Sequence, residues 1–165
     1  MEHNISLDPE QLRQVMRAWA SGVTVVTAQY GEEWHGMTVS SFTSIALQPP
    51  LVAVSLQMTS RTHRLVSQAG AFAVTILAED QREISERFAG RLSDQAERLA
   101  GLATQTLVTG APLLEGGLAW LDCRVTQTIP AGGNTLFLAE VVAAQQRKKG
   151  RPLLYHQRHY TRLAE

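Results

Sequence analysis

The run VTVVTA at residues 23–28 decides the character of the fold, because most of its residues are β-branched. β-Branched side chains pack well on a pleated surface and favour strands over helices. The sequence YGEE at 30–33 then supplies a turn, and a second strand-like run extends from residue 36 to residue 47. The two runs are therefore predicted to pair as a β-hairpin.

An amphipathic helix is predicted upstream of this hairpin. Asp8 is a good N-cap, Pro9 fits the first helical position, and Gly22 supplies a stop. Between them, apolar residues recur at helical spacing: Leu12, Val15, Met16 and Trp19. The helix should thus present one apolar face.

Downstream of the hairpin, a strand, a helix and a second strand are expected in turn. The run LVAVSL at 51–56 is typical of a short buried strand, and two prolines separate it from the hairpin. Ser60 should cap a helix that continues to about residue 68, and Gly70 should end it. The β-branched sequence at 72–77 predicts the second strand.

A third helix is expected to begin at a capping box made by Asp80 and Glu83, and to carry Ile84 and Phe88. The stretch 90–101 that follows is polar and helix-prone, with weak periodicity.

The last third of the chain is predicted to be mostly strand. A turn at 130–134 joins strands at 117–129 and 135–144, and a short pair at 153–155 and Tyr160 closes the chain.

These elements add up to about seven strands, with helices between them and no βαβ alternation. We therefore predict one domain over residues 1–165. Its fold class should be mainly β with peripheral helices, as an antiparallel barrel rather than a parallel sheet.

The charge balance excludes whole classes of partner. The 165 residues include 15 Lys plus Arg and 15 Asp plus Glu, so the formal net charge is zero. Nucleic-acid-binding domains need a surplus of cations, and peripheral membrane proteins need a basic or lipidated segment. We expect no nucleic acid and no membrane as partners. With 44% hydrophobic and 18% charged residues, the chain should form a globule with further apolar surface buried at a subunit interface.

The cysteine count and the N-terminus bear on the compartment. A single cysteine, Cys123, excludes an intramolecular disulfide and a cysteine-based metal cage. The first residues, MEHN, carry an acid where a signal peptide needs cations, and no apolar run approaches the roughly 20 residues of a membrane span. We therefore expect a soluble, cytoplasmic protein.

Common catalytic signatures are absent from the sequence: there is no glycine-rich dinucleotide or phosphate loop, no HExxH and no GxSxG. His156 and His159 are three apart, but in sequence that predicts strand and turn, so we interpret them as ordinary polar residues and not as metal ligands. The basic run RKKGR at 147–151 is interpreted as a solvated turn, with recognition of nucleic acid or of a cofactor phosphate as the alternatives.

Hydroxyl-bearing residues gather at 36–45, in the sequence GMTVSSFTSI. A strand that runs into a loop there can present hydroxyls and free backbone amides on one side. The sequence SRT at 60–62 begins a helix, and a helix N-terminus favours a phosphate. Ser55 and Leu56 lie between the two segments. A neutral protein can bind an anionic cofactor through such dipoles.

Several ordered motifs make the chain recognisable over nearly its full length: MRAWASGVTVVT at 16–27, HGMTVSSF at 35–42, PPL at 49–51, GAFAV at 70–74, LAEDQ at 77–81 and GAPLL at 110–114. With them the chain resembles the short-chain flavin reductases, which are the reductase components of two-component flavin-dependent monooxygenases. The styrene and 4-hydroxyphenylacetate monooxygenase reductases look like the nearest kind.

The resemblance implies the FMN-binding split-barrel fold, an antiparallel Greek-key barrel, and the activity of an NAD(P)H:flavin oxidoreductase. Such an enzyme reduces FMN or FAD with NADH or NADPH and supplies reduced flavin to a separate oxygenase. Hydride transfer requires only that the nicotinamide C4 lie over the flavin N5 at roughly 3 to 3.5 Å, without nucleophile or metal. The resemblance also implies a homodimer.

The residues that the resemblance assigns to the flavin belong to the hydroxyl-rich segment, the following strand, the helix start and one aromatic position: Thr38, Val39, Ser40, Ser41, Ser55, Leu56, Ser60, Arg61, Thr62 and Phe88. The last of these can equally be a core aromatic.

One position departs from the family pattern. Many relatives carry Gly-Asp-His before the penultimate long strand, and that histidine is expected to contact the nicotinamide; here the third residue is Asn134. Asparagine donates and accepts hydrogen bonds but does not titrate near neutrality. We place Asn134, His156 and Tyr160 on the nicotinamide side. A second hypothesis remains open, a split-barrel flavin-binding or carrier protein with little reductase activity.

Overall fold

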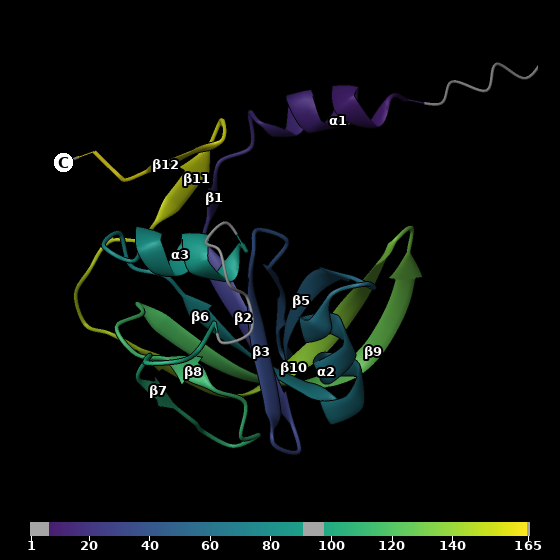
Figure 1. Ribbon diagram of the computed structural model, residues 1–165, viewed down its shortest axis with the longest axis vertical. Helices are drawn as coiled ribbons and strands as arrows, with labels where there is room; N and C mark the ends of the chain where they lie inside the picture. Colours follow the sequence, from purple (N-terminus) through teal and green to yellow (C-terminus); the bar gives the residue numbers. More distant parts are fainter. Residues whose placement is uncertain (1–6, 91–97, 165) are drawn as a thin grey trace, which may run out of the picture.

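The structure, a computed structural model, describes residues 7–90 and 98–164. Figure 1 shows strands in the centre and helices at the periphery. The helices in the described ranges are α1 (Pro9–Met16), α2 (Arg61–Ala69) and α3 (Arg82–Phe88). Most of the stretch at 90–101, for which the sequence predicts polar helix, lies outside the described residues.

The principal sheet has seven strands: β2 (Thr24–Tyr30), β3 (Glu33–Val39), β4 (Thr43–Leu47), β5 (Pro50–Gln57), β6 (Ala71–Ile76), β9 (Ala119–Ala131) and β10 (Asn134–Gln146). Smaller sheets contain the short strands β1 (Ser21–Gly22), β11 (Leu154–His156) and β12 (His159–Thr161), and the pair β7 (Thr104–Gln105) and β8 (Leu113–Leu114).

The order of strands in the principal sheet is β3-β2-β6-β9-β10-β5-β4, and all neighbours are antiparallel. The connection from β5 to β6 carries α2 and passes over β10 and β9, as a Greek-key arrangement requires. The edges are β3 and β4, and no ladder joins them in the described chain. The prediction of a mainly β, antiparallel fold with peripheral helices is thus confirmed, and the sheet curls into a barrel that is split between β3 and β4.

The hairpin of β2 and β3 is confirmed, with Tyr30 paired to Glu33 at its end. The predicted single run from 36 to 47 is wrong, because it divides into β3 and β4. Between them the Ser41 hydroxyl donates to the carbonyl of Ser55 at 2.8 Å and accepts from its N–H at 3.2 Å. These bonds fix the chain against β5 at the point where it crosses the split.

Helix α1 begins as predicted, since the Asp8 carboxylate accepts from the N–H of Glu10 at 3.0 Å. The predicted end at Gly22 is wrong: the helix stops at Met16, and Gly22 pairs with Leu154 of β11. The backbone at 21–22 is extended because it completes a sheet with the end of the chain. None of the helical residues of α1 is buried, and Figure 1 shows the helix projecting from the barrel.

The other two helices differ in how they start. Ser60 caps α2 by accepting from the N–H of His63 at 3.1 Å, and Gly70 ends it with φ +63°, both as predicted. The capping box predicted for α3 is wrong. Gln81 occupies its N-cap position without a capping bond, and its side chain accepts instead from the N–H of Ala78 at 2.9 Å.

The C-terminal strands differ in bounds from the prediction: β9 (Ala119–Ala131) is shifted relative to the predicted 117–129, and β10 (Asn134–Gln146) is longer than the predicted 135–144. The turn between β9 and β10 is confined to Gly132 and Gly133, where Gly132 has φ +61°, a conformation that favours glycine. The predicted closing pair is confirmed as β11 and β12. None of the helices in the described ranges combines the length and the apolar character needed to cross a membrane.

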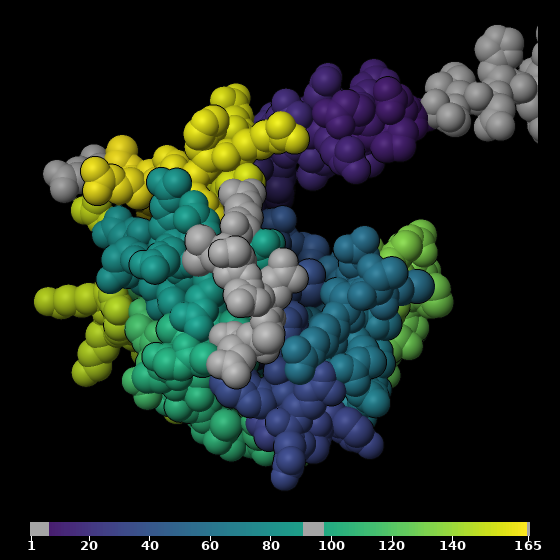
Figure 2. All heavy atoms as spheres, in the orientation of Figure 1, coloured from purple at the N-terminus to yellow at the C-terminus, as the bar shows by residue number. Residues whose placement is uncertain are grey.

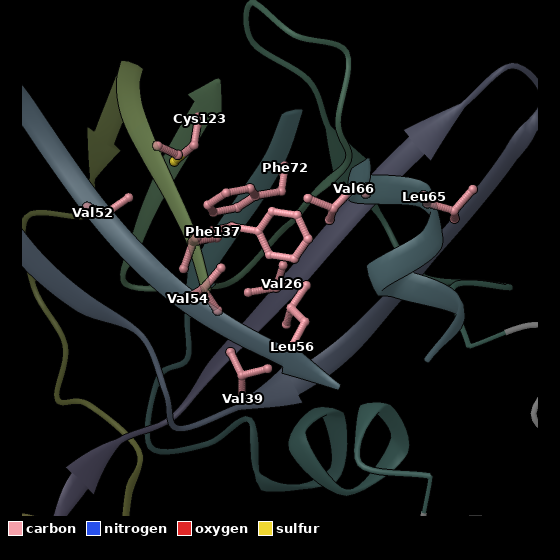
Figure 3. Packing of buried hydrophobic residues seen from close by; sticks show 13 residues of the cluster. Val26, Val39, Val52, Val54, Leu56, Leu65, Val66, Phe72, Cys123 and Phe137 are labelled. Atoms are coloured by element: carbon pink, nitrogen blue, oxygen red, sulfur yellow. The ribbon is translucent and has the colours of Figure 1, made fainter. Parts of the chain in front are cut away.

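The main core lies inside the curl of the principal sheet, beneath α2, as Figure 3 shows. Phe72 of β6 and Phe137 of β10 meet at its centre, and Leu56 and Val66 close it on the α2 side. Cys123 belongs to this core, and burial raises the pKa of its thiol to about 12. The cysteine is therefore an inert packing residue.

Candidate functional site

A groove runs across the end of β3, made of hollows that share lining residues. The central hollow has a volume of about 180 Å³ and is lined by Val23, Thr38, Val39, Ser40, Ser85, Ala89, Tyr155 and Tyr160. It shares Thr38 and Ala89 with the helix hollow, about 580 Å³, whose lining includes Ser60, Arg61 and Thr62 at the start of α2. On its other side it shares Ser40 and Tyr155 with the α1 hollow, about 490 Å³.

Three segments far apart in sequence meet at the central hollow: β3, α3 and the hairpin of β11 and β12. The Thr38 hydroxyl on β3 donates to the carbonyl of Ser85 on α3 at 2.6 Å. The hydroxyls of Ser85 and Tyr160 lie 2.8 Å apart, and the rings of Tyr155 and Tyr160 pack edge to face at 5.3 Å. The hairpin of β11 and β12, here called the C-terminal hairpin, is thereby held over the hydroxyl-rich segment at 36–45.

The helix hollow combines the N-terminus of α2 with cationic side chains. Arg61 donates through Nε to the carboxylate of Glu33 at 2.6 Å, and Arg64 donates to the same oxygen at 2.5 Å. These hydrogen bonds hold the pKa of Glu33 below its usual range. Arg98 crosses the hollow and donates through Nη1 to the carbonyls of Gly36 and Phe88. Backbone N–H groups, hydroxyls and guanidinium groups form a donor set that fits a phosphate.

Thr62, predicted for the flavin, lines the helix hollow and is also bonded within the protein. Its side chain is buried, and its hydroxyl lies 2.8 Å from Nδ1 of His35 on β3. Burial, followed by the charges of Arg98 and Arg61, lowers the pKa of His35 to about 4. The imidazole is therefore neutral at physiological pH, and Thr62 fixes its orientation against α2.

Polar residues predicted for the flavin and for the nicotinamide meet at the split. Asn134 at the start of β10 donates through Nδ2 to the Ser55 hydroxyl at 3.0 Å. The Ser55 backbone is bonded in turn to Ser41. The three side chains form a connected network on the strands β5 and β10 and the loop after β3. Asn134, predicted for the nicotinamide, is thus bonded to a residue predicted for the flavin.

Four predicted residues line none of the three hollows: Ser55, Leu56, Asn134 and His156. The side chains of Leu56 and Phe88 are fully buried, in the main core and in a second cluster under the C-terminal hairpin respectively. Phe88 is therefore a core aromatic that also lines the floor of the helix hollow. His156 pairs with His159 across β11 and β12 and lines none of the three hollows.

The residues that sequence reasoning missed are His35, Ser85, Arg98 and Tyr155. His35 lies in a quoted motif, but its contact with Thr62 depends on the packing of α2 against β3. Arg98 lies in the stretch 90–101, whose periodicity is too weak to predict an element. Ser85 is recognisable only after the C-terminal hairpin has been placed over α3.

Other candidates from the sequence gain no support as sites. In the described part of the chain, no three His, Cys, Asp or Glu side chains come together in a way that could hold a metal ion. The basic run at 147–151 lies between β10 and β11, where Arg147 donates to the carbonyls of Lys149 and Gly116.

Comparison with known proteins gives consistent matches over nearly the whole chain. The family model described as "Flavin reductase like domain" matches residues 16–164. The NADH-dependent flavin reductase StyB of Pseudomonas fluorescens is 37% identical over 94% of this chain and 91% of its own length. The reductase component of 4-hydroxyphenylacetate 3-monooxygenase from Thermus thermophilus is 37% identical over 93% and 96%.

Among solved structures, the flavin reductase PheA2 in its native state superposes with a TM-score of 0.89 at 33% identity, over 96% of this chain and all of that chain. The fold of these neighbours is the split barrel, which agrees with the open edge between β3 and β4.

His35 should make the stability of the protein depend on pH. Its pKa is about 4 in the folded protein and 6.5 when unperturbed, so the unfolded chain binds the proton more tightly. Stability is then fully present above pH 6.5 and falls as the pH drops towards 4, by at most about 3 kcal/mol. Urea unfolding at several pH values should show this loss, and H35Q should lack it. H159Q, which removes an exposed histidine, serves as the control; a loss of the same size in H35Q would contradict the assignment.

Proposed function

Because the chain belongs to the flavin reductase family, we propose that it oxidises NADH or NADPH, reduces FMN or FAD, and releases reduced flavin to a separate flavin-dependent monooxygenase. The relatives support both parts of the proposal: one is named as an NADH-dependent flavin reductase, and another as the reductase component of a monooxygenase. On this reading the whole chain works as one reductase domain, and a reducing cytoplasm is its natural compartment.

The observation that carries the proposal is the groove, in which Thr38, Val39 and Ser40 line the same hollow as Tyr160. Reduction requires hydride to pass from the nicotinamide to a flavin stacked against it, in a dry site. In our proposal Thr38, Ser40 and Ser41 hold the flavin ring and ribityl chain, with Ser55 behind them. Tyr160 closes the nicotinamide side, where Ser85 keeps its hydroxyl in place.

We assign the phosphate of the flavin to the helix hollow. Ser60 is the N-cap of α2, so the free N–H groups of its first turn and the guanidinium of Arg61 are available to an anion. Thr62 supports this end indirectly through His35. Arg61 retains an anion-binding capacity beside Glu33 because only its Nε atom is engaged by that carboxylate in the described contacts.

The carrier hypothesis has one feature in its favour, which is Asn134. Its side-chain amide donates a hydrogen bond to the Ser55 hydroxyl. Asparagine is also uncharged, so it cannot pair with the phosphates of a pyridine nucleotide. The tyrosines over the central hollow favour the reductase, because a protein that only stores flavin has no need of a second wall beside the ring.

We further propose a homodimer in which apolar residues of α1 and of the segment directly after it pack against a second copy. Leu12, Val15, Met16 and Trp19 are each more than half exposed, at 51%, 65%, 52% and 69%. Figure 2 shows an open space beneath α1, and the α1 hollow there is lined by Trp19, Ser40 and Ser41 among others. A second copy seated on α1 would complete the groove at this end.

A steady-state assay that crosses both nicotinamides with both flavins tests the reductase directly. We expect NADH oxidation, followed by loss of its absorbance, that depends on added FMN or FAD under aerobic conditions. NADPH is compared under the same conditions to define the donor. Flavin binding without nicotinamide oxidation above the background would favour the carrier hypothesis.

Replacing Ser41 by alanine should weaken flavin binding. The change removes the hydroxyl that ties the loop after β3 to the Ser55 backbone, so the wall behind the ring loosens. We expect the Kd of FMN, from fluorescence titration, to rise about 5-fold. T126A removes an exposed hydroxyl that donates to a strand carbonyl elsewhere on the sheet and is the matched control. Superimposable titration curves for S41A and the wild type would show that the flavin lies elsewhere.

The dimer is tested by sedimentation equilibrium. The wild-type protein should sediment as a dimer, and V15E should shift it to a monomer because a carboxylate cannot be buried unpaired in an apolar interface. V108E introduces the same charge at another exposed valine and should leave the dimer intact. A monomeric wild type, or an unchanged dimer in V15E, would rule out this interface.

A further inference from the structure

Glu33 lies at the end of the β2–β3 hairpin and reaches across to α2. Its backbone pairs with that of Tyr30, and Gly31 in the turn between them has φ +60°. The Glu33 carboxylate is thereby held beside the first turn of α2, where it contacts Arg61 and Arg64. The hairpin thus brings an acid to the helix start that we assign to the flavin phosphate.

A single carboxylate oxygen bonds to both arginines. Oε1 of Glu33 accepts from Nε of Arg61 at 2.6 Å and from Nη2 of Arg64 at 2.5 Å. These hydrogen bonds keep the pKa of Glu33 below its usual range, so the carboxylate is ionised at neutral pH. One negative charge therefore lies between two positive charges at the start of α2.

Arg61 connects this carboxylate with the helix hollow. Glu33 and Arg61 both line a neighbouring hollow of about 540 Å³, but of the two only Arg61 also lines the helix hollow. Glu33 therefore leaves the space for a phosphate open, and it acts on a phosphate there through the guanidinium that both contact. Two anions on one guanidinium repel each other, so each weakens the binding of the other.

The contribution of these ion pairs to the stability of the fold is small. The side chains of Glu33, Arg61 and Arg64 are 33%, 41% and 51% exposed, and ion pairs so open to solvent add little to stability. Their larger effect is on an anion that binds beside them, because that anion interacts with the sum of the three charges.

We propose that Glu33 is a built-in counter-ion that lowers the affinity of the helix hollow for the flavin phosphate. This inference rests on the proposed function and deepens it, because a reductase that supplies flavin to a separate protein has to release that flavin. With Glu33 on its Nε atom, Arg61 keeps its Nη atoms for the phosphate, while the net positive charge around the phosphate is reduced. Flavin then exchanges with solvent and is not held as a tightly bound group.

The test is the Kd of FMN in E33Q, by fluorescence titration without any nicotinamide. Glutamine removes the charge but keeps a side-chain oxygen that can accept from Arg61, so the variant isolates the electrostatic effect. We expect the Kd of FMN to fall about 5-fold, and the difference from the wild type should shrink as the salt concentration rises. A gain of affinity cannot come from a damaged fold, and thermal melting checks that the variant is folded.

Riboflavin and E32Q are the matched controls. Riboflavin has the ring and ribityl chain of FMN but no phosphate, so its Kd should change less than about 2-fold in E33Q. Glu32 is an exposed carboxylate of the same turn that forms no ion pair within the described residues. E32Q should therefore leave the Kd of FMN within about 2-fold of the wild-type value.

Three results would overturn the inference. One is an unchanged or higher Kd of FMN in E33Q, which would mean that Glu33 is neutral towards phosphate binding or supports it. Another is an equal fall for riboflavin, which would show that the effect does not depend on the phosphate. The third is an equal fall in E32Q, which would leave Glu33 without a specific role. Failure of the proposed function is distinguishable, because it is the absence of flavin-dependent nicotinamide oxidation by the wild-type protein, whatever E33Q does to binding.

Discussion

The hydroxyl of Ser41 bonds to both backbone groups of Ser55, and the functional groove depends on this contact. The sheet is split between β3 and β4, so no ladder holds its two ends together in the described chain. The loop after β3 crosses that split, and Ser41 fixes it against β5. Without the bond, the strand end that carries Thr38 and Val39 would lose its position relative to Ser55 and Asn134. A split barrel exposes strand ends in this way, and here the exposed ends bear the polar groups of the groove.

The electrostatics of the groove are compatible with the anionic ligand of the proposed function, although the net charge of the protein is zero. Glu33 is held between Arg61 and Arg64, so much of the positive charge at the start of α2 is balanced within the protein. The groups that remain available to a ligand are directional hydrogen-bond donors. They are the N–H groups at the start of α2, nearby hydroxyls and the guanidinium nitrogens that do not bond to Glu33. Dipoles fixed by the fold bind a phosphate without a strong field over the rest of the surface. Buried His35 stays neutral here because two arginines and desolvation oppose its charge.

Asn134 illustrates how one substitution changes meaning once the fold is known. In the sequence, Asn134 stands where many relatives are expected to have a histidine that contacts the nicotinamide. The sequence therefore raises the question of how the nicotinamide is bound. In the structure its amide donates to the Ser55 hydroxyl, and Asn134 does not line the hollow that contains Tyr155 and Tyr160. Under the proposed function, the nicotinamide side of the groove is formed by Tyr155 and Tyr160. The Tyr160 hydroxyl lies 2.8 Å from that of Ser85 on α3, and Tyr155 packs against the Tyr160 ring.

The sequence by itself determined the strand-rich class, the β2–β3 hairpin, the start and end of α2, and the family, because these depend on local pattern: β-branched runs, a serine cap, glycine at positive φ and ordered motifs. It also identified the hydroxyl-rich segment and Tyr160 as parts of one site. Only the tertiary structure decided that Thr62 holds His35, that Leu56 and Phe88 belong to cores, and that Arg98 reaches the groove. Those outcomes depend on contacts between residues that are distant in sequence. A local sequence pattern can predict that a side chain is buried, but not which distant element it packs against.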